Sequence, residues 1–507
     1  MLAPIDRLLN RITMYRLVLY VLIALLALAA VFGAAGILPY SPVAIIFSSL
    51  FLVAICWITN GLLAKAFHAQ PNVESAYITA LILALIITPG MPNDLGTIWF
   101  LIWAGVLAMA SKYLFAVTKK HLFNPAAFAV VTTAFALNQY ASWWIGGNLP
   151  MMAFVIAGGL LITRKIKRFD LVLAFFAAAA VSCIAFAPSF DPWGTVQKLI
   201  LHTPLFFFAF VMLTEPLTTP PTRSLQIAYG VVVGALYSPF AHIGSIYSTP
   251  ELALVVGNVF SYAISPKRKY LLALVEKHEV GNGIYDLTFT PDRAVSFRPG
   301  QYLEWTLAHE PSDGRGNRRY FTIASSPTEP NVHLGVKFYE PSSSFKKHLL
   351  AMAAGEQLIA GQLAGDFTLP RDPAKKLAFI AGGIGITPFR SMVKYITDTG
   401  EKRDAILFYS NRENNEVAYQ EIFDEAEAAW GLKTVYAVTD ASQPVPAHNG
   451  VKGRIDAALI ERTIPDYRER MFYISGTHAM VSAFKKTLAE LGVPRSQIKT
   501  DFFPGFA

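Results

Sequence analysis

Apolar and polar positions follow different patterns in the two parts of the chain. Residues 1–265 contain long apolar runs with few interruptions, whereas residues 271–507 contain short runs separated by turn-forming residues. A helix needs about 20 apolar residues to cross a bilayer, so the first part predicts a polytopic α-helical membrane domain. We expect about ten helices, with eight as the alternative. The expected spans are 15–36, 42–62, 74–89, 96–115, 125–142, 150–163, 169–187, 200–214, 224–240 and 250–264.

The second part of the chain predicts two soluble domains. Over residues 271–372, short alternating runs with turns between them indicate an antiparallel β-barrel. Over residues 373–507, buried strands alternate with helical stretches. This alternation favours a parallel α/β sheet that binds ligands at the carboxyl ends of its strands. Residues 266–270 form a short basic linker between the membrane domain and the soluble part.

Charge follows the same division. Residues 1–265 contain 13 of the 43 Lys and Arg residues and 7 of the 35 Asp and Glu residues. Nearly all of these basic residues precede the first expected span or follow an even-numbered one. Cytoplasmic loops carry such an excess, so both termini and the soluble domains are expected on the cytoplasmic side of a bacterial-type inner membrane. The excess indicates topology and does not predict a nucleic-acid-binding surface.

Cysteine and histidine usage limits the redox groups that the chain can hold. The two cysteines, Cys56 and Cys183, lie in apolar runs and build neither a disulfide framework nor a cysteine-ligated iron–sulfur cluster. A haem-containing membrane reductase needs paired histidines at mid-membrane, and the histidines of the first part do not supply them. No metal site is expected. Those histidines are His68, His121, His202 and His242.

Two loops of the membrane part contain helix-breaking prolines, in Asn124-Pro125 and Glu215-Pro216. At membrane depth, broken backbone persists only where it is buried in protein or lines a cavity. Plain helix ends with turn residues are an equally good interpretation of the spacing alone.

The sequences around these loops carry a family resemblance. Three segments matter: Ser111-Lys112, His121-Leu122-Phe123-Asn124-Pro125-Ala126-Ala127 and Met212-Leu213-Thr214-Glu215-Pro216-Leu217-Thr218. Over roughly residues 15–265, the chain resembles the membrane subunit family shared by the sodium-pumping NADH:quinone reductase (its B subunit) and the Rnf complex (its D subunit). The resemblance implies ten helices and a flavin carried in the membrane. Lys112, Asn124 and Thr218 are then candidate contacts of a non-covalent FMN or riboflavin.

The chain departs from this family at two places. Glu215 stands where aspartate is usual, and the Ser-Gly-Ala-Thr-type sequence whose threonine carries covalent FMN is missing. The nearest candidate is Thr195, which follows Asp191 but lacks the alanine and the correct spacing. We therefore expect no covalent FMN at Thr195. The favoured interpretation is an exposed loop with Trp193 at the membrane interface.

One strand of the expected barrel has the chemistry to hold a flat ring with a phosphate tail. Alternate residues of a strand face opposite sides, so Arg319 and Phe321 are expected to share a face, while Thr322 offers its hydroxyl to a ring nitrogen. A guanidinium suits a phosphate and an aromatic side chain suits a ring. On its own, the stretch is also typical of an ordinary edge strand.

Two further segments predict phosphate seats. Ser343 and Ser344 open a helical run, where N–H groups and hydroxyls can bind a diphosphate or simply cap the helix. Gly382-Gly383-Ile384-Gly385-Ile386-Thr387-Pro388 links a buried strand to a helix, and its glycines allow a phosphate to approach the backbone. This turn is not the usual Gly-x-Gly-x-x-Gly fingerprint.

Together with Ser475-Gly476-Thr477-His478-Ala479-Met480 and the ending Asp501–Ala507, these segments resemble the ferredoxin–NADP reductase family over essentially all of residues 271–507. The resemblance implies FAD on Arg319-Tyr320-Phe321-Thr322 and Ser343-Ser344. It implies NAD(P)H on the glycine turn, with Thr322, Ser475 and Asp501 as candidate catalytic residues. Phe321 and Ser475 replace the usual tyrosine and cysteine. The remaining candidate cofactor contacts are Gly382, Gly383, Gly385, Thr387, Pro388, Gly476, Met480, Phe503 and Phe506.

The choice between NADH and NADPH depends on the strand end where the adenosine ribose is expected. Ser410 and Arg412 are suited to grip a 2′-phosphate, whereas Glu413 and Glu416 would oppose one. We lean to NADH.

These features predict a membrane flavoprotein oxidoreductase. Electrons are expected to pass from cytoplasmic NAD(P)H through FAD to a second flavin, a quinone or an extracytoplasmic carrier. Because the chain offers no iron–sulfur relay, the FAD is expected to work close to the membrane part. The alternative is a redox-driven or redox-regulated ion transporter, although acidic residues are nearly absent from the expected spans. A non-catalytic scaffold is disfavoured by the four cofactor motifs.

Overall fold

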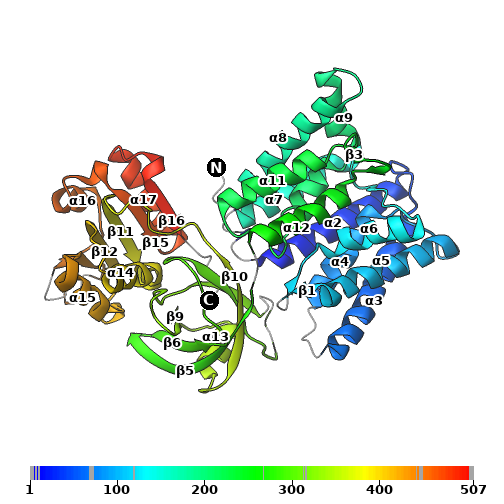
Figure 1. Ribbon diagram of the computed structural model, residues 1–507. Coiled ribbons are helices and arrows are strands. Elements are labelled where there is room, and N and C mark those ends of the chain that lie inside the picture. The colour runs from blue at the N-terminus through cyan, green and yellow to red at the C-terminus, as the bar shows by residue number, and fades with distance from the viewer. Residues whose placement is uncertain are drawn as a thin grey trace. The chain divides into compact units, whose positions relative to one another are not determined.

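The computed structural model describes residues 5, 8–9, 12–67, 73–117, 120–265, 268–311, 313, 317–440, 442–444 and 449–501. The chain forms two compact units, Met1–Arg268 and Lys269–Ala507. Figure 1 shows the first as a bundle of helices and the second as two sheets with their covering helices.

The first unit is helical. Each of the ten expected ranges contains a helix, but among the described residues only five helices are long and apolar enough to cross a membrane, or six if the bent pair α9 and α10–η1 is one span. Four other helices have only 13–15 residues, so ten membrane spans remain a prediction. The helices are α2 (Met14–Ala34), α3 (Pro42–Ala66), α4 (Val73–Ile86), α5 (Leu95–Leu114), α6 (Pro125–Leu137), α7 (Leu149–Ile166), α8 (Phe169–Phe186), α9 (Pro192–His202), α10 (Leu205–Phe207), the π-helix η1 (Phe208–Met212), α11 (Arg223–Leu236) and α12 (Pro250–Ile264).

Small residues bring the helices of this unit close together. A Cβ atom added at Gly230 of α11 would lie 2.6 Å from the carbonyl oxygen of Leu171, and one at Gly234 would lie 2.6 Å from that of Phe175. Helix pairs in membranes commonly use small residues in this way. Two short hairpins, β1–β2 (Ala116–Val117 and Lys120–His121) and β3–β4 (His242–Ile243 and Ile246–Tyr247), join helices of the bundle.

The second unit begins with a six-stranded sheet in the order β8-β7-β10-β5-β6-β9, in which all paired strands are antiparallel. Its inner side chains, including Trp305, Phe289 and Leu303, form one core with Phe345 of α13. β8 and β9 end the order, and closure of the sheet into a barrel remains a prediction. The elements are β5 (Tyr270–Gly281), β6 (Ile284–Pro291), β7 (Tyr302–Thr306), β8 (Arg318–Thr322), β9 (Val332–Lys337), α13 (Ser344–Ala351) and β10 (Gln357–Ala364).

A parallel sheet follows in the order β14-β13-β12-β11-β15-β16, as the alternation of strands and helices predicts. Successive residues of β11 enter two different cores: Phe379 packs with α14 and α15, and Ile380 packs with α16 and α17. The elements are β11 (Leu377–Gly382), η2 (Gly383–Ile386), α14 (Thr387–Thr399), β12 (Ala405–Asn411), η3 (Asn414–Glu416), α15 (Gln420–Trp430), β13 (Lys433–Val438), β14 (Gly450–Lys452), α16 (Ala457–Thr463), η4 (Tyr467–Glu469), β15 (Met471–Ser475), α17 (His478–Glu490), η5 (Arg495–Gln497) and β16 (Ile498–Asp501).

Candidate functional site

Strand β8 presents Arg319 and Phe321 on one face. Both contact Phe345 of α13: the guanidinium carbon of Arg319 lies 5.1 Å from the centre of that ring, and the Phe321 ring centre lies 6.1 Å from it. Tyr320 faces the other way and donates a hydrogen bond from its hydroxyl to Glu304 Oε2 (2.8 Å). Thr322, at the end of the strand, is buried. The strand therefore offers a cation and an aromatic ring side by side, as its alternation predicts.

The N-terminus of α13 already holds an anionic group. Ser343 caps the helix, its Oγ accepting the N–H of Lys346 (3.4 Å). The Ser344 N–H donates to a carboxylate oxygen of Asp313 (3.0 Å), and Arg319 Nη2 lies 4.0 Å from the other carboxylate oxygen. A helix N-terminus and a guanidinium thus meet around one negative charge. The same donors fit the diphosphate of FAD.

The glycine turn after β11 packs tightly against the end of β15. A Cβ atom added at Gly385 would lie 2.5 Å from the carbonyl oxygen of Ser475, and one at Gly382 would lie 2.1 Å from Met480 Sδ. Gly383 has a φ of +52° and open space where a Cβ would stand. The turn therefore exposes bare backbone in front of α14, which begins at Thr387 with Pro388 next to it. This arrangement fits a phosphate group.

The register of the parallel sheet brings further predicted residues to the same edge. Gly382 pairs with Ser410 of β12, Ala381 pairs with Ser475, and Ser475 pairs with Asp501 of β16. Ligands of open parallel sheets bind at the carboxyl ends of the strands. Phe503 and Phe506 lie outside the described residues, so their expected place over the flavin stays a prediction.

The adenosine end of the site differs from expectation in one respect. The side chain of Arg412 is exposed, and its backbone N–H donates to Glu416 Oε2 (3.2 Å). Glu416 Oε1 also accepts a hydrogen bond from Lys337 Nζ (2.7 Å). Lys337 offsets the charge with which Glu416 was expected to oppose a 2′-phosphate. Two charged residues considered at this strand end then decide between the cofactors: Glu413 opposes a 2′-phosphate and favours NADH, whereas Arg412 could bind one.

In the helical unit, Glu215 connects two of the three predicted flavin contacts. Asn124 Nδ2 donates to Glu215 Oε2 (2.9 Å), and Thr218 Oγ1 donates to the same oxygen (3.1 Å). Lys112 donates to Ser75 O (3.1 Å) and Thr79 Oγ1 (3.0 Å) of α4, two residues that line the same cavity as Asn124 and Glu215.

A small cavity lies between these groups. Its volume is about 60 Å³, and its polar lining includes Ser75, Thr79, Asn124 and Glu215. Ligand pockets for flavin-sized molecules are several times larger. The loop breaks therefore line a cavity inside the helical unit, and Asn124 is itself buried.

Thr195 stands in a different setting. It lies in the first turn of α9, where Asp191 Oδ1 caps the helix by accepting the N–H of Gly194 (3.0 Å). The neighbouring Trp193 is 78% exposed within its unit. This is an ordinary capped helix start, in keeping with the expectation of an exposed segment.

Two polar residues of the helical unit make contacts that were not predicted. Asn258 of α12 accepts the backbone N–H of Asn124 (2.7 Å) and donates to the hydroxyl of Tyr229 (3.0 Å). Glu251, 3% exposed, accepts a hydrogen bond from Trp143 Nε1 (2.9 Å). An isolated polar residue in an apolar run was the available signal for both. Glu251 is one of the few acidic residues within the expected spans.

Within the described residues, no group of three or more metal-ligating side chains comes together. The fold and the two cradles of the second unit define the class: a flavin- and nicotinamide-dependent oxidoreductase domain of the ferredoxin reductase type. The helical unit, with several apolar helices, has the features of a membrane protein.

Comparison with known proteins supports both assignments. Residues 143–269 match the NQR2, RnfD, RnfE family, and residues 379–486 match the oxidoreductase NAD-binding domain. The chain therefore joins an RnfD/NqrB-family domain to a ferredoxin reductase-type NAD-binding domain.

This chain spans only part of the length of the curated relatives that it matches. The glycine betaine monooxygenase reductase subunit of Chromohalobacter salexigens is 30% identical over 223 residues, which are 42% of this chain and 59% of that protein. A flavohemoprotein of a Burkholderia species is 29% identical over 211 residues, or 41% and 52% of the two chains. The FAD/NAD-binding domain of nitric oxide dioxygenase from Vibrio cholerae superposes with a TM-score of 0.41 at 18% identity, covering 46% of this chain and 98% of that domain.

Proposed function

We propose that the protein is a membrane oxidoreductase that takes electrons from NAD(P)H and passes them to an acceptor in the membrane. The observation that carries the proposal is the pairing of two cradles in one unit: the anion seat of α13 beside Arg319, and the glycine turn against Ser475. FAD, when bound, supplies the conversion between two-electron and one-electron transfer. The chain contributes binding, alignment and the exclusion of water.

Each cradle has its own role in this proposal. Arg319, Ser343 and Ser344 would hold the diphosphate of FAD, with Tyr320 and Phe321 beside the ring and the hydroxyl of Thr322 toward a ring nitrogen. Gly382, Gly383, Gly385, Thr387 and Pro388 would hold the nicotinamide dinucleotide, with Ser410 and Arg412 at its adenosine end. Ser475, Gly476, Met480 and Asp501 would border the nicotinamide, and Phe503 and Phe506 would cover the flavin.

The helical unit is proposed to receive the electrons. A second, non-covalent flavin near Lys112, Asn124 and Thr218 is supported by the resemblance of the loop motifs and by their position around Glu215. Because the cavity there is small, binding would require these loops to open. The final acceptor is proposed to be a quinone or an extracytoplasmic carrier. We propose that Thr195 carries no covalent FMN.

The topology is part of the same proposal. Ten spans, with both termini and the soluble unit on the cytoplasmic side of an inner membrane, agree with the loop charges. We place the membrane domain at 1–265, the linker at 266–270, the flavin domain at 271–372 and the nucleotide domain at 373–507.

An anaerobic ultraviolet–visible titration tests the proposal. The purified full chain, loaded with FAD, is expected to lose its flavin absorbance when NADH or NADPH is added, and extraction is expected to yield at least one flavin per chain. Absorbance that NAD(P)H leaves unchanged would reject the function. The same spectrum would reveal a haem, which this proposal excludes.

Ion transport is the second candidate, favoured by the buried carboxylate of Glu251 in the helical unit. Ionisable groups within membrane helices often mark ion pathways. In proteoliposomes, oxidation of NAD(P)H that depends on sodium would support transport, whereas a rate that is independent of sodium and of proton ionophores would reject it.

A further inference from the structure

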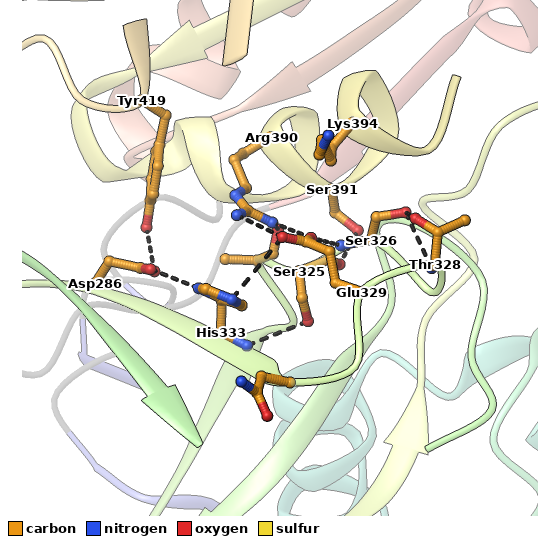
Figure 2. A network of polar contacts seen from close by, with 12 residues as sticks. Asp286, Ser325, Ser326, Thr328, Glu329, His333, Arg390, Ser391, Lys394 and Tyr419 are labelled. Atoms are coloured by element: carbon orange, nitrogen blue, oxygen red, sulfur yellow. Dashed lines mark hydrogen bonds and ion pairs between the residues drawn. The ribbon is translucent and has the colours of Figure 1, made fainter. Parts of the chain in front are cut away.

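Five side chains form a closed set of contacts between the antiparallel and the parallel sheet of the second unit (Figure 2). We call this set the polar ring. Three of its members are less than 8% exposed, and the side chains of the other two are less than 20% exposed. The members are Asp286, Glu329, His333, Arg390 and Tyr419.

Arg390 of α14 makes the first connection. Its Nη2 donates to Glu329 Oε1 (2.9 Å), and its Nη1 donates to Glu329 Oε2 and to the carbonyl oxygen of Ala324 (3.1 Å). The adjacent Ser391 donates from Oγ to the carbonyl oxygen of Ser325 (2.6 Å). The first turns of α14 are therefore tied to the segment that follows β8.

Tyr419, just before α15, makes the second connection. Its hydroxyl donates to Asp286 Oδ1 on β6 (2.8 Å), and Asp286 Oδ2 lies 2.6 Å from His333 Nδ1 on β9. His333 Nε2 lies 3.9 Å from Glu329 Oε1, and the guanidinium carbon of Arg390 lies 5.7 Å from the centre of the Tyr419 ring. These two contacts close the ring.

The backbone around the ring bears local costs. Tyr419 has a φ of +61°, a conformation that a bulky residue adopts only under constraint. A Cβ atom added at Gly335 of β9 would lie 2.5 Å from Thr387 Cγ2 and 2.6 Å from Tyr419 Oη. An added Cβ would therefore force the side chain of Thr387 or Tyr419 to shift. Such features indicate that the surrounding structure fixes this contact.

Stability alone is a weak explanation for the ring. Burying paired charges costs desolvation energy that their attraction often only offsets, so a buried ion pair is weak evidence for stability. The position of the ring in the chain suggests another role. Thr322, which ends β8, lies two residues before Ala324, and the glycine turn ends directly before α14, which carries Arg390.

We propose that the polar ring positions the glycine turn against the end of β8, and so sets how closely a nicotinamide ring meets a flavin ring. This inference rests on the proposed function. Hydride transfer needs reacting atoms about 3–3.5 Å apart, and a misplacement of about 1 Å can cost about a hundredfold in rate. The five residues are positioning residues, because the proposal gives them no contact with the reacting atoms.

The test compares two arginine-to-lysine variants of the full, FAD-loaded chain. Arg390→Lys keeps the charge but cannot hold Glu329 with two parallel hydrogen bonds. Arg470→Lys is the matched control: Arg470 is 7% exposed, binds Asp404 and Asp466, and lies at the amino end of β15, the edge opposite the glycine turn.

Two readouts separate positioning from folding. Stopped-flow bleaching over a range of NADH concentrations gives the limiting rate and the apparent Kd, and hydrogen exchange of the chain without NADH reports on residues 323–330 and 387–395. For Arg390→Lys we expect a limiting rate lower by about tenfold or more, an apparent Kd within about twofold of wild type, and faster exchange in both segments. Arg470→Lys is expected to match wild type in all three.

Several results would overturn the inference. They are an unchanged limiting rate in Arg390→Lys, equal losses in the two variants, or a loss confined to the apparent Kd. If Arg390→Lys fails to retain FAD, Tyr419→Phe and Glu329→Gln decide the matter in the same assays, and unchanged rates in both would reject it. If NADH does not bleach the flavin of the wild-type protein, the proposed function itself is rejected. Failure of the positioning role and failure of the proposed function therefore give different results.

Discussion

Gly382 and Gly385 of the glycine turn lie against neighbours that differ in their freedom to move. At Gly385, an added Cβ would meet the carbonyl oxygen and carbon of Ser475 at 2.5 and 2.7 Å. That backbone belongs to β15, which is paired on both sides, so it cannot move aside. At Gly382, the added Cβ would meet the thioether of Met480, which is flexible and can rotate away. The two positions therefore differ in their tolerance of alanine.

We expect Gly385→Ala to weaken NAD(P)H binding about tenfold or more and to destabilise the second unit by about 1–3 kcal/mol, the usual cost of forcing extra atoms into packed structure. Gly382→Ala should lose less in both respects, because only a flexible side chain must move. Nucleotide-induced difference spectra and thermal melting measure the two effects. Equal losses in the two variants would show that the backbone contact at Gly385 has no special role.

Asp286 gives the second unit a pH dependence whose sign can be worked out. Burial would raise the pKa of Asp286, but the hydrogen bond and charge of His333, the charge of Arg390 and the hydroxyl of Tyr419 together hold that pKa below its usual value. An unfolded aspartate has a pKa of about 3.9. The stability that Asp286 contributes is therefore fully present above about pH 4 and is lost as the pH falls through the lower pKa of the folded state.

Asp286→Asn should then cost about 1–3 kcal/mol at pH 7, the range for a buried polar group that loses a charged partner. The difference between wild type and variant should shrink below about pH 4, where the carboxylate becomes protonated. Flavin release on heating, followed by fluorescence at each pH, measures it. A difference that persists unchanged at pH 3 would mean that the carboxylate charge of Asp286 is not what stabilises the ring.

At the scale of elements, the start of α6 links a helix cap to the Glu215 cluster. Asn124 Oδ1 accepts the N–H of Ala127 (3.0 Å), while its Nδ2 donates to Glu215. One side chain thus caps the helix and orients a carboxylate. Loss of an asparagine cap costs about 1 kcal/mol, and here it also leaves Glu215 without one of its donors.

Asn124→Ala is expected to lower electron transfer to a membrane acceptor at least severalfold and to leave NADH oxidation with ferricyanide unchanged. Ferricyanide is expected to take electrons directly from the second unit. A loss seen only with the membrane acceptor therefore lies in the helical unit. Asn60→Ala is the matched control, because Asn60 is equally buried and accepts a hydrogen bond from Tyr113 (2.9 Å) away from Glu215. Equal losses in both variants would reduce the role of Asn124 to folding.

The elements also show what the sequence could and could not predict. Apolar runs and strand–helix alternation located the helices and the parallel sheet, because burial dictates both patterns. The sequence did not predict where every helix ends: a span was expected over residues 125–142, whereas α6 ends at Leu137. The polar ring could not be predicted from the sequence, because contacts such as that between Tyr419 and Asp286 join residues 133 positions apart. Single residues such as Arg319 were recognisable because their chemistry is local, whereas their partners depend on the whole fold.

At the scale of the whole molecule, the two units divide the proposed reaction. The second unit carries both nucleotide cradles, and the helical unit carries the Glu215 cluster. Within the described residues, the structure contains two cysteines, both unpaired and buried in the helical unit, and no cluster of metal ligands. Two cysteines are too few to build a cysteine-ligated iron–sulfur cluster, which needs four such ligands. In the proposed reaction, electrons would pass from the flavin of the second unit to an acceptor in the helical unit.

Cutting the chain between the units tests this division. A protease site inserted between Ser265 and Lys269 should leave NADH oxidation by ferricyanide intact after cleavage, because each compact unit keeps its own core. Reduction of a short-chain quinone in proteoliposomes should fall at least tenfold, because the effective concentration that the linker supplies is lost. The uncleaved insertion variant is the control. Full quinone reduction by the washed membranes after cleavage would mean that the units associate without the linker; quinone reduction by the released soluble unit alone would show that the helical unit is not part of the electron path.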